Sequence, residues 1–347
     1  MASIWFWLVA ALLTMYVVLD GFDLGAGSVY HLVSRTDAER RSVLKSIGPV
    51  WDANEVWLLT AGGSLVLAFP KLYASSFSGF YLPLMTVLWL LILRAVALEF
   101  RNHLNDPVWR PFWDVVFSGA SLLLTIFLGA ALGNVVRGVP LDANGYFFSP
   151  LWTNFTTVGD RMGILDWFTV TVGVTSMLAL VHHGSLWVAL KTGGPVHERA
   201  NKVAGWTWPL LVLATALVTV FTFRIQPHVP ARMAEHPAGY VFPVLALAGL
   251  GVSLWSRRGG RELGAFLGSA TFLVGMLLSV SFGLYPMVLP ATNGIAASLT
   301  VSNAMGPEHG MRVAFWWWIP GMALVTAYTV FIYRNMRGKV DVEGEGY

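Results

Sequence analysis

The sequence contains no cysteine, and only 12% of its 347 residues are charged. Without cysteine, disulfides, cysteine-ligated zinc, iron–sulfur clusters and thiol catalysis are all excluded. Soluble domains carry about 25% charged residues, so the low charge content argues against a soluble protein. The N-terminus also lacks a basic segment followed by a small-residue cleavage site, and we therefore expect it to be retained as a first membrane span.

What is present is apolar sequence: 56% of the residues are hydrophobic, and the mean hydropathy is +0.62. This composition predicts an all-α integral membrane protein that crosses the bilayer many times. We expect residues 1–347 to form a single polytopic domain of helical bundles that spans the lipid bilayer. Nine apolar windows predict the spans, at roughly 3–33, 47–69, 76–100, 112–136, 164–190, 205–223, 238–255, 262–283 and 311–333.

The distribution of lysine and arginine predicts the orientation of these spans. Of the 22 basic residues, fifteen fall in one set of alternate connections, five in the other, and Arg94 and Arg312 lie within spans. Cytoplasmic loops carry the excess of basic residues, so the N-terminus is expected outside and the C-terminus in the cytoplasm. The net charge of +3 is then explained by cytoplasmic loops, and no nucleic-acid partner is expected.

Two aspartates lie deep within the first predicted span. At 1.5 Å per helical residue, Asp20 is about 26 Å from the outer end of the span and so in the inner leaflet. Asp23 is three residues further on and shares its helical face. A carboxylate at such a depth costs roughly 2.5–3.5 kcal/mol on insertion scales, and a chain that carries two of them needs an explanation.

The second and third spans carry more ionisable groups at a similar depth. Asp52 and Glu55 are three residues apart where span two leaves the cytoplasm, and span three carries Arg94 and Glu99 towards it. One interpretation is that these groups pair with one another and hold helices together. The other is a hydrated inlet or proton relay open to the cytoplasm, because ionisable residues inside a membrane are functional by default.

Histidines give no evidence of a haem site in this chain. His182 and His183 are adjacent in span five and therefore point to different faces of the helix. No two spans place histidines opposite each other at mid-membrane depth, which a b-type haem would favour. We expect neither a haem nor a metal ion to be ligated here.

Several motifs in this chain resemble subunit II of the cytochrome bd quinol oxidases. They cover residues 3–340 in matching order, and they read LDGFDLGAG, GPVWDANEVWLLTAGG, FSGFYLPLMTVLWLLILRAVALEFR, GNVVRGVPLD, YPMVLPATNGIAASLTVSNA and YTVFIYRNMRGKV. The first two together are highly specific. Ala53 departs from the family, which has glycine in the WDGNEVW form, and this departure concerns local packing only.

The resemblance implies a partner, subunit I, that carries the quinol site, two haem b and one haem d, often accompanied by small single-helix subunits. The implied complex oxidises quinol and reduces dioxygen to water with protons from the cytoplasm, in the cytoplasmic membrane of a bacterium or archaeon. The implied role of subunit II is to support assembly of the haem subunit. In some members it also contributes a proton inlet, an oxygen route and a structural quinone.

Carried onto this chain, the resemblance implies that Asp52 is the principal residue of the proton inlet, followed by Asp20. Asp23 and Glu55 are expected to shape the hydrogen-bond network around these two acids. Arg94 and Glu99 are expected to form a buried pair. Trp51 and Trp57 either line an apolar route for dioxygen or pack at the subunit interface.

Three other functions compete with an oxidase subunit. A proton-coupled secondary transporter also needs buried acids, but it is expected to show inverted repeats and a site at the bilayer midplane. A diheme cytochrome acting alone needs facing histidine pairs. A purely structural scaffold predicts that neutralising the acids affects assembly alone.

Overall fold

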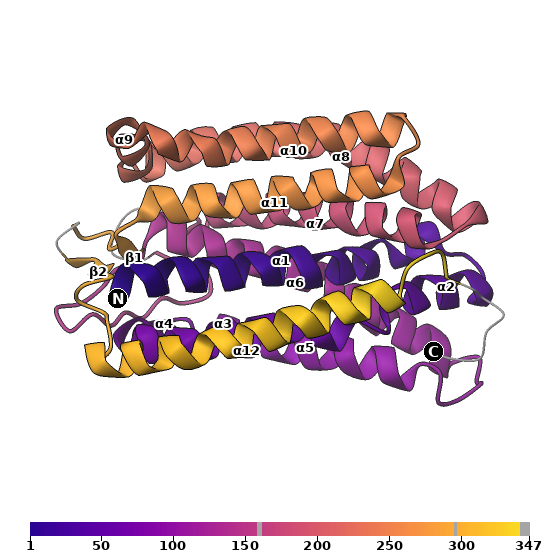
Figure 1. Cartoon of the computed structure of the whole chain (residues 1–347), viewed down its shortest axis with the longest axis horizontal. Coiled ribbons are helices and arrows are strands. Elements are labelled where there is room, and N and C mark those ends of the chain that lie inside the picture. Colours follow the sequence, from indigo (N-terminus) through magenta and orange to yellow (C-terminus); the bar gives the residue numbers. More distant parts are fainter. Residues whose placement is uncertain (158–161, 295–296, 341–347) are drawn as a thin grey trace.

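The computed structural model describes residues 1–157, 162–294 and 297–340, and nearly all of them outside the loops are helical (Figure 1). The elements in chain order are α1 (Ala2–Val33), α2 (Asp37–Ile47), α3 (Trp51–Ala68), α4 (Pro70–Gly79), α5 (Tyr81–Phe100), α6 (Trp109–Arg137), α7 (Trp167–Lys191), α8 (Gly194–Ile225), α9 (His228–Glu235), the 3₁₀ helix η1 (Pro237–Tyr240), α10 (Val241–Arg258), α11 (Glu262–Leu284), β1 (Met287–Leu289), β2 (Leu299–Thr300) and α12 (Glu308–Asn335).

Eight of these helices are long and apolar enough to cross a membrane, and the bent pair α3–α4 makes up to nine in the described part of the chain. The predicted all-α membrane fold is thereby confirmed. The long helices run side by side along the long axis of the molecule, with α7, α8, α10 and α11 on one side of α1 and α6, and α3, α5 and α12 on the other (Figure 1). Which end faces the cytoplasm stays a prediction at this point.

The second predicted span, 47–69, corresponds to α3, and the chain bends sharply where this span ends. Helix α3 ends at Ala68, and α4 leaves it at an angle of 118°. Pro70 explains the break, because it lacks a backbone N–H and disfavours a helical conformation in Phe69 before it. Pro70 is instead accommodated in the first turn of α4, where no helical hydrogen bond to its nitrogen is needed.

Helix α8 begins at Gly194, whereas the hydropathy window starts at residue 205. The first turns of the helix are polar, so a window that scores apolar residues does not detect them. Pro195 lies in the first turn and Gly193 precedes the helix in an extended conformation, which together define its start.

The central helix α1 is packed backbone to backbone against α7. A Cβ placed on Gly25 would lie 1.9 Å from the carbonyl oxygen of Leu180, and one on Gly184 would lie 2.3 Å from the nitrogen of Ala26. Only glycine allows two helices to approach so closely. This contact fixes the rotation of α1, and so determines which way its aspartates point.

The two ends of the bundle differ in charge. At one end, here called the basic end, α2 lies across the helix termini and carries Arg40, Arg41 and Lys45. Its N-terminus is closed by a capping box between Thr36 and Glu39, a motif that satisfies otherwise unpaired backbone N–H groups. At the opposite end, the strands β1 and β2 pair antiparallel, with Met287 opposite Thr300.

Candidate functional site

Asp20 and Asp23 are both fully buried and lie in the half of α1 nearer the basic end. Arg94 of α5 reaches Asp20 with Nη1 donating to Oδ1 at 2.7 Å, and its Nη2 donates to Oε1 of Glu55 on α3. Arg94 is itself only 1% exposed. One guanidinium therefore joins carboxylates from two other helices inside the bundle.

Asn54 of α3 completes this group. Its Nδ2 donates to Oδ2 of Asp23 at 2.7 Å and more weakly to the carbonyl of Leu19 at 3.3 Å. Its Oδ1 accepts a 3.0 Å hydrogen bond from the hydroxyl of Tyr333 on α12. Asp20, Asp23, Asn54, Glu55 and Arg94 are together called the buried acid cluster.

The buried acid cluster has more acid than base. Three carboxyl groups face one guanidinium, and within the described residues Oδ2 of Asp20, Oδ1 of Asp23 and Nε of Arg94 are buried without a hydrogen-bond partner. The buried hydroxyl of Tyr16, one helical turn before Asp20, lies beside this carboxyl group. Buried charges that are not fully paired are costly. A group of this composition has the capacity to hold protons and to exchange them.

Asp52 lies outside this cluster, on the surface. It is exposed in the first turn of α3 and borders a hollow of about 400 Å³ between α3, α5 and α12. This surface, here called the acid hollow, is lined by Gly48, Pro49, Trp51, Asp52, Ala53, Glu99 and Tyr328. Glu55 lies one turn beyond Asp52 with its side chain 24% exposed, so it is the acid of the buried acid cluster that is reached first from the side of Asp52.

The predicted pairing of Arg94 with Glu99 is wrong. Arg94 pairs with Asp20 and Glu55 instead, while Glu99 is exposed and lines the acid hollow. Residues five apart lie about 140° around a helix, so a side chain that faces the core at 94 cannot have a core-facing neighbour at 99. Arg94 therefore belongs to the buried acid cluster, whereas Glu99 belongs to the acid hollow at the surface.

The two tryptophans of α3 occupy different surroundings. Trp51 borders the acid hollow and packs against the interior near α2. Trp57 is buried among Leu12, Tyr16 and Ala61. Neither lines the apolar cavity that lies between α1, α3, α4, α6 and α11, and their part in an oxygen route stays a prediction.

A second charged network lies at the basic end and escaped the sequence-based prediction. Asp114 of α6 is fully buried and accepts hydrogen bonds from Tyr30 at 2.6 Å, from Arg101 Nε at 2.6 Å and from Arg40 at 2.9 Å. Arg101 also donates to Asp37 of α2 at 2.7 Å. Two signals were available: Asp114 falls within the fourth predicted span, and Tyr30 lies seven residues from Asp23 on the same face of α1.

Asp37 is held ionised by this network. Partial burial raises the pKa of its carboxyl, but the hydrogen bond and charge of Arg101, with the charges of Arg41 and Arg110, outweigh burial and lower the pKa below its ordinary value of 3.8. These contacts attach α2 to the end of α5 and to α6, about two helical turns closer to the basic end than the buried acid cluster. The network thus holds the basic end of α1, α5 and α6 in register.

The two buried histidines of α7 join helices. His182 places Nδ1 3.1 Å from the carbonyl of Ala204 and Nε2 3.0 Å from the hydroxyl of Ser253. His183 places Nδ1 2.7 Å from the hydroxyl of Ser269 and Nε2 3.0 Å from the carbonyl of Val18. Since all four ring nitrogens face protein groups, neither side chain fits an axial haem ligand. Across the described ranges, no group of three or more metal-ligating side chains is assembled.

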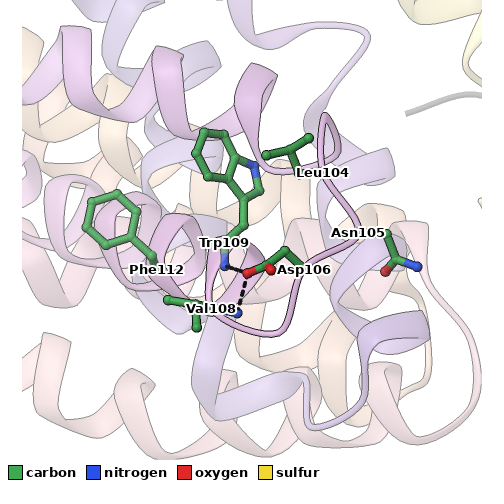
Figure 2. A pocket seen from close by; sticks show the side chains of 6 residues that line it. All are labelled: Leu104, Asn105, Asp106, Val108, Trp109 and Phe112. Atoms are coloured by element: carbon green, nitrogen blue, oxygen red, sulfur yellow. Dashed lines mark hydrogen bonds between the residues drawn. The ribbon is translucent and has the colours of Figure 1, made fainter.

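An open hollow at the α5–α6 turn carries no such chemistry. Figure 2 shows its lining, in which Asp106 points back to the start of α6 and accepts hydrogen bonds from the nitrogens of Val108 and Trp109 at 2.8 and 3.0 Å. Its carboxylate is therefore used as a helix cap. The acid hollow and the buried acid cluster remain the candidate site.

Comparisons with known proteins agree on one family. The family model described as cytochrome bd terminal oxidase subunit II matches residues 1–336. The probable cytochrome oxidase subunit 2 of Haemophilus influenzae is 30% identical over 97% of this chain and 94% of its own length. The cytochrome bd ubiquinol oxidase subunit 2 of Bacillus subtilis is 31% identical, over 90% of this chain and 88% of its own.

The fold is shared with a solved structure as well. The bd oxidase from Geobacillus thermodenitrificans superposes with a TM-score of 0.77, covering 97% of this chain and 98% of that chain at 18% sequence identity. At this level of identity the likeness concerns the fold alone. It extends along the whole bundle, including the helices that carry the acids.

Proposed function

Because this chain belongs to the cytochrome bd terminal oxidase subunit II family, we propose that it works beside a haem-bearing subunit I as the proton inlet of a quinol oxidase. Membership makes it a component of a respiratory terminal oxidase in a bacterial membrane. Quinol would supply the electrons for dioxygen reduction by way of the partner's haems, and this reduction consumes protons. The residues of this chain would collect those protons at its basic end.

The observation that carries this proposal is the continuity from surface acid to buried acid. Asp52 and Glu99 lie in the acid hollow, Glu55 is half-buried one turn further in, and Asp20 is fully buried beside the same guanidinium as Glu55. A proton taken up at Asp52 therefore meets a series of carboxyl groups of increasing depth. The fifteen basic residues in the connections of this end favour a cytoplasmic location for it.

The partner is expected to cover the face formed by α3, α5 and α12. Large apolar side chains are exposed there, including Leu59, Trp89 and Leu324, and the acid hollow opens between the same three helices. Lipid would cover the apolar side chains equally well, but not the carboxyl groups at the depth of a span. A protein partner that meets Asp52, Glu55 and Glu99 with polar groups removes this cost, and it brings the acids next to the partner's interior.

We assign the structural quinone implied by the resemblance to the apolar cavity at the opposite end. This cavity of about 260 Å³ is walled by side chains of α1, α3, α4, α6, α11 and β1, and Leu132 and Val280 also line a second cavity further along the bundle. Its lining suits an isoprenoid chain. Filling it with Leu132→Trp should lower the quinone extracted per purified complex, whereas the lipid-facing Leu217→Trp should not; equal quinone content in both would withdraw the assignment.

The inlet is tested by Asp52→Asn in the purified complex. Quinol oxidation is expected to slow while haem content stays near that of the wild type, because the exposed side chain contributes no packing. Glu198→Gln, an exposed carboxylate of α8 at the same end, is the matched control and should leave turnover unchanged. Unaltered turnover in Asp52→Asn removes Asp52 from the proton route, and loss of haem in that variant instead favours a structural scaffold.

A further inference from the structure

Helix α12 is held to the bundle by few side chains. Met311 is its only buried residue among those the structure describes. Near its other end, however, Tyr333 packs edge-on against Phe22 of α1 and Trp187 of α7, with ring centroids 6.5 and 6.1 Å away. Phe22 and Trp187 are stacked on each other at 4.0 Å. This aromatic group brings the last helix to the buried acid cluster.

The hydroxyl of Tyr333 fixes the orientation of the Asn54 side chain. It donates to Oδ1 of Asn54, while Nδ2 donates to Asp23 and to the carbonyl of Leu19. The amide oxygen and both amide N–H groups of Asn54 therefore each have a protein partner. A rotated amide would turn its oxygen towards two acceptors, Asp23 and the Leu19 carbonyl, and would leave the hydroxyl of Tyr333 facing an N–H group.

We propose that Tyr333 is a positioning residue of the proton inlet, acting through Asn54 to keep a hydrogen-bond donor on Asp23. This inference rests on the proposed function of the buried acid cluster. The other charged groups that face Asp23 are Asp20 on its own helix, Glu55 on α3 and Arg94 on α5. Since Arg94 pairs with Asp20 and Glu55, Asn54 is the group that supplies Asp23 with a direct donor among the described residues.

The residues that follow α12 hold Tyr333 at this place. Lys191, at the end of α7, donates to the carbonyls of Met336 and Gly338, and the nitrogen of Val340 donates to the carbonyl of Lys191 at 2.8 Å. Lys339 donates to the carbonyl of Thr192 at 2.8 Å and to Glu262 of α11 at 3.0 Å. These contacts tie residues 336–340 to the helix that carries Trp187, one turn before Lys191. We call these contacts of residues 336–340 the clamp. The clamp determines where the hydroxyl of Tyr333 lies relative to Asn54.

Removing one hydroxyl tests the proposal in the assembled oxidase. Tyr333→Phe is expected to lower kcat for quinol oxidation, and the rate of proton uptake, about two- to tenfold, which is the range that one neutral hydrogen bond supports. The KM for quinol and the haem content should not change, because neither the quinol site nor the packing of the ring is altered. Tyr240→Phe removes an exposed hydroxyl at the opposite end and serves as the matched control.

A double-mutant cycle shows whether Tyr333 acts through Asn54. In an Asn54→Ala background, Tyr333→Phe should have no further effect on proton uptake, whereas independent roles would give additive effects. Lys191→Met removes the two side-chain bonds of the clamp, to Met336 and Gly338, without touching the buried acid cluster. It should slow proton uptake, by no more than Tyr333→Phe does. Wild-type uptake in Tyr333→Phe, additivity in the cycle, or loss of haem in Tyr333→Phe would each overturn the proposal.

Asp23→Asn distinguishes a failure of the proton inlet from a failure of the positioning role of Tyr333. If Asp23→Asn takes up protons at the wild-type rate, the proposed function of Asp23 fails and the role of Tyr333 fails with it. If Asp23→Asn is slow and Tyr333→Phe is not, the inlet stands and only the positioning role is refuted.

Discussion

Replacing Arg94 with methionine should destabilise the protein far more than a typical substitution. The guanidinium is 1% exposed and bonds to both Asp20 and Glu55, so methionine fills most of its volume but leaves carboxylates without their cation. Breaking a buried ion pair by removing one partner costs about 3–5 kcal/mol. Lysine at the same position keeps the charge but cannot bond to two carboxylates in the planar geometry of arginine, and it should lie between methionine and the wild type.

The assay is thermal unfolding of the purified complex in lipid nanodiscs, followed by tryptophan fluorescence together with haem content. The compensated variant, Arg94→Met with Asp20→Asn and Glu55→Gln, removes the charges on both sides and should recover most of the lost stability without recovering turnover. If Arg94→Met unfolds at the wild-type temperature, the carboxylates do not depend on Arg94. If the compensated variant turns over normally, these charges are not part of the proton route.

Two further predictions concern the parts that hold the site in place. Asp37→Asn should lower stability at pH 7 by about 0.2–1 kcal/mol, because the Asp37 side chain is 39% exposed and solvent screens its ion pairs. The pKa of Asp37 is lowered in the folded protein, so its contribution is complete above the ordinary value of 3.8 and is lost as the pH falls through the lower, folded value. Unfolding curves of the two proteins should therefore converge only below that folded pKa, and a gap that persists at the acid limit would refute the network's role. Gly25→Ala should separate α1 from α7 and cost about 1–3 kcal/mol or more, because the new Cβ meets a backbone oxygen at 1.9 Å. Gly251→Ala on α10 should be tolerated, because among the described residues a Cβ there meets no atom of another helix within 4 Å. Equal melting temperatures for the two variants would contradict the close packing.

The helices and the faces that carry the acids could be predicted from local sequence. The spacing of Asp20 and Asp23 places them on one side of α1 whatever the rest of the chain does, and the composition determines the membrane fold. The break at Ala68 also had a local signal in Pro70. These features depend on neighbouring residues, so a sequence reveals them.

The partners of each acid could not be predicted in the same way. Arg94 and Glu99 lie on one helix, and the choice of which faces the core depends on how α5 is rotated against α1 and α3. Asp114 meets Arg40, which lies 74 residues earlier in the chain, and Tyr333 meets Asn54 across 279 residues. Such contacts are determined by the packing of whole helices, of which the glycine contact between α1 and α7 is one decisive element.

The central claim is that the buried acid cluster passes protons from the basic end to the oxidase reaction. It is tested most directly by proton uptake during a single turnover of the complex in oriented vesicles, with a pH indicator on the side that the basic end faces. Asp20→Asn leaves Arg94 paired with Glu55, so the complex should assemble with haem and be reduced by quinol, yet take up protons more slowly per haem than the wild type. Uptake at the wild-type rate on that side, or uptake from the other side of the membrane, would contradict the account.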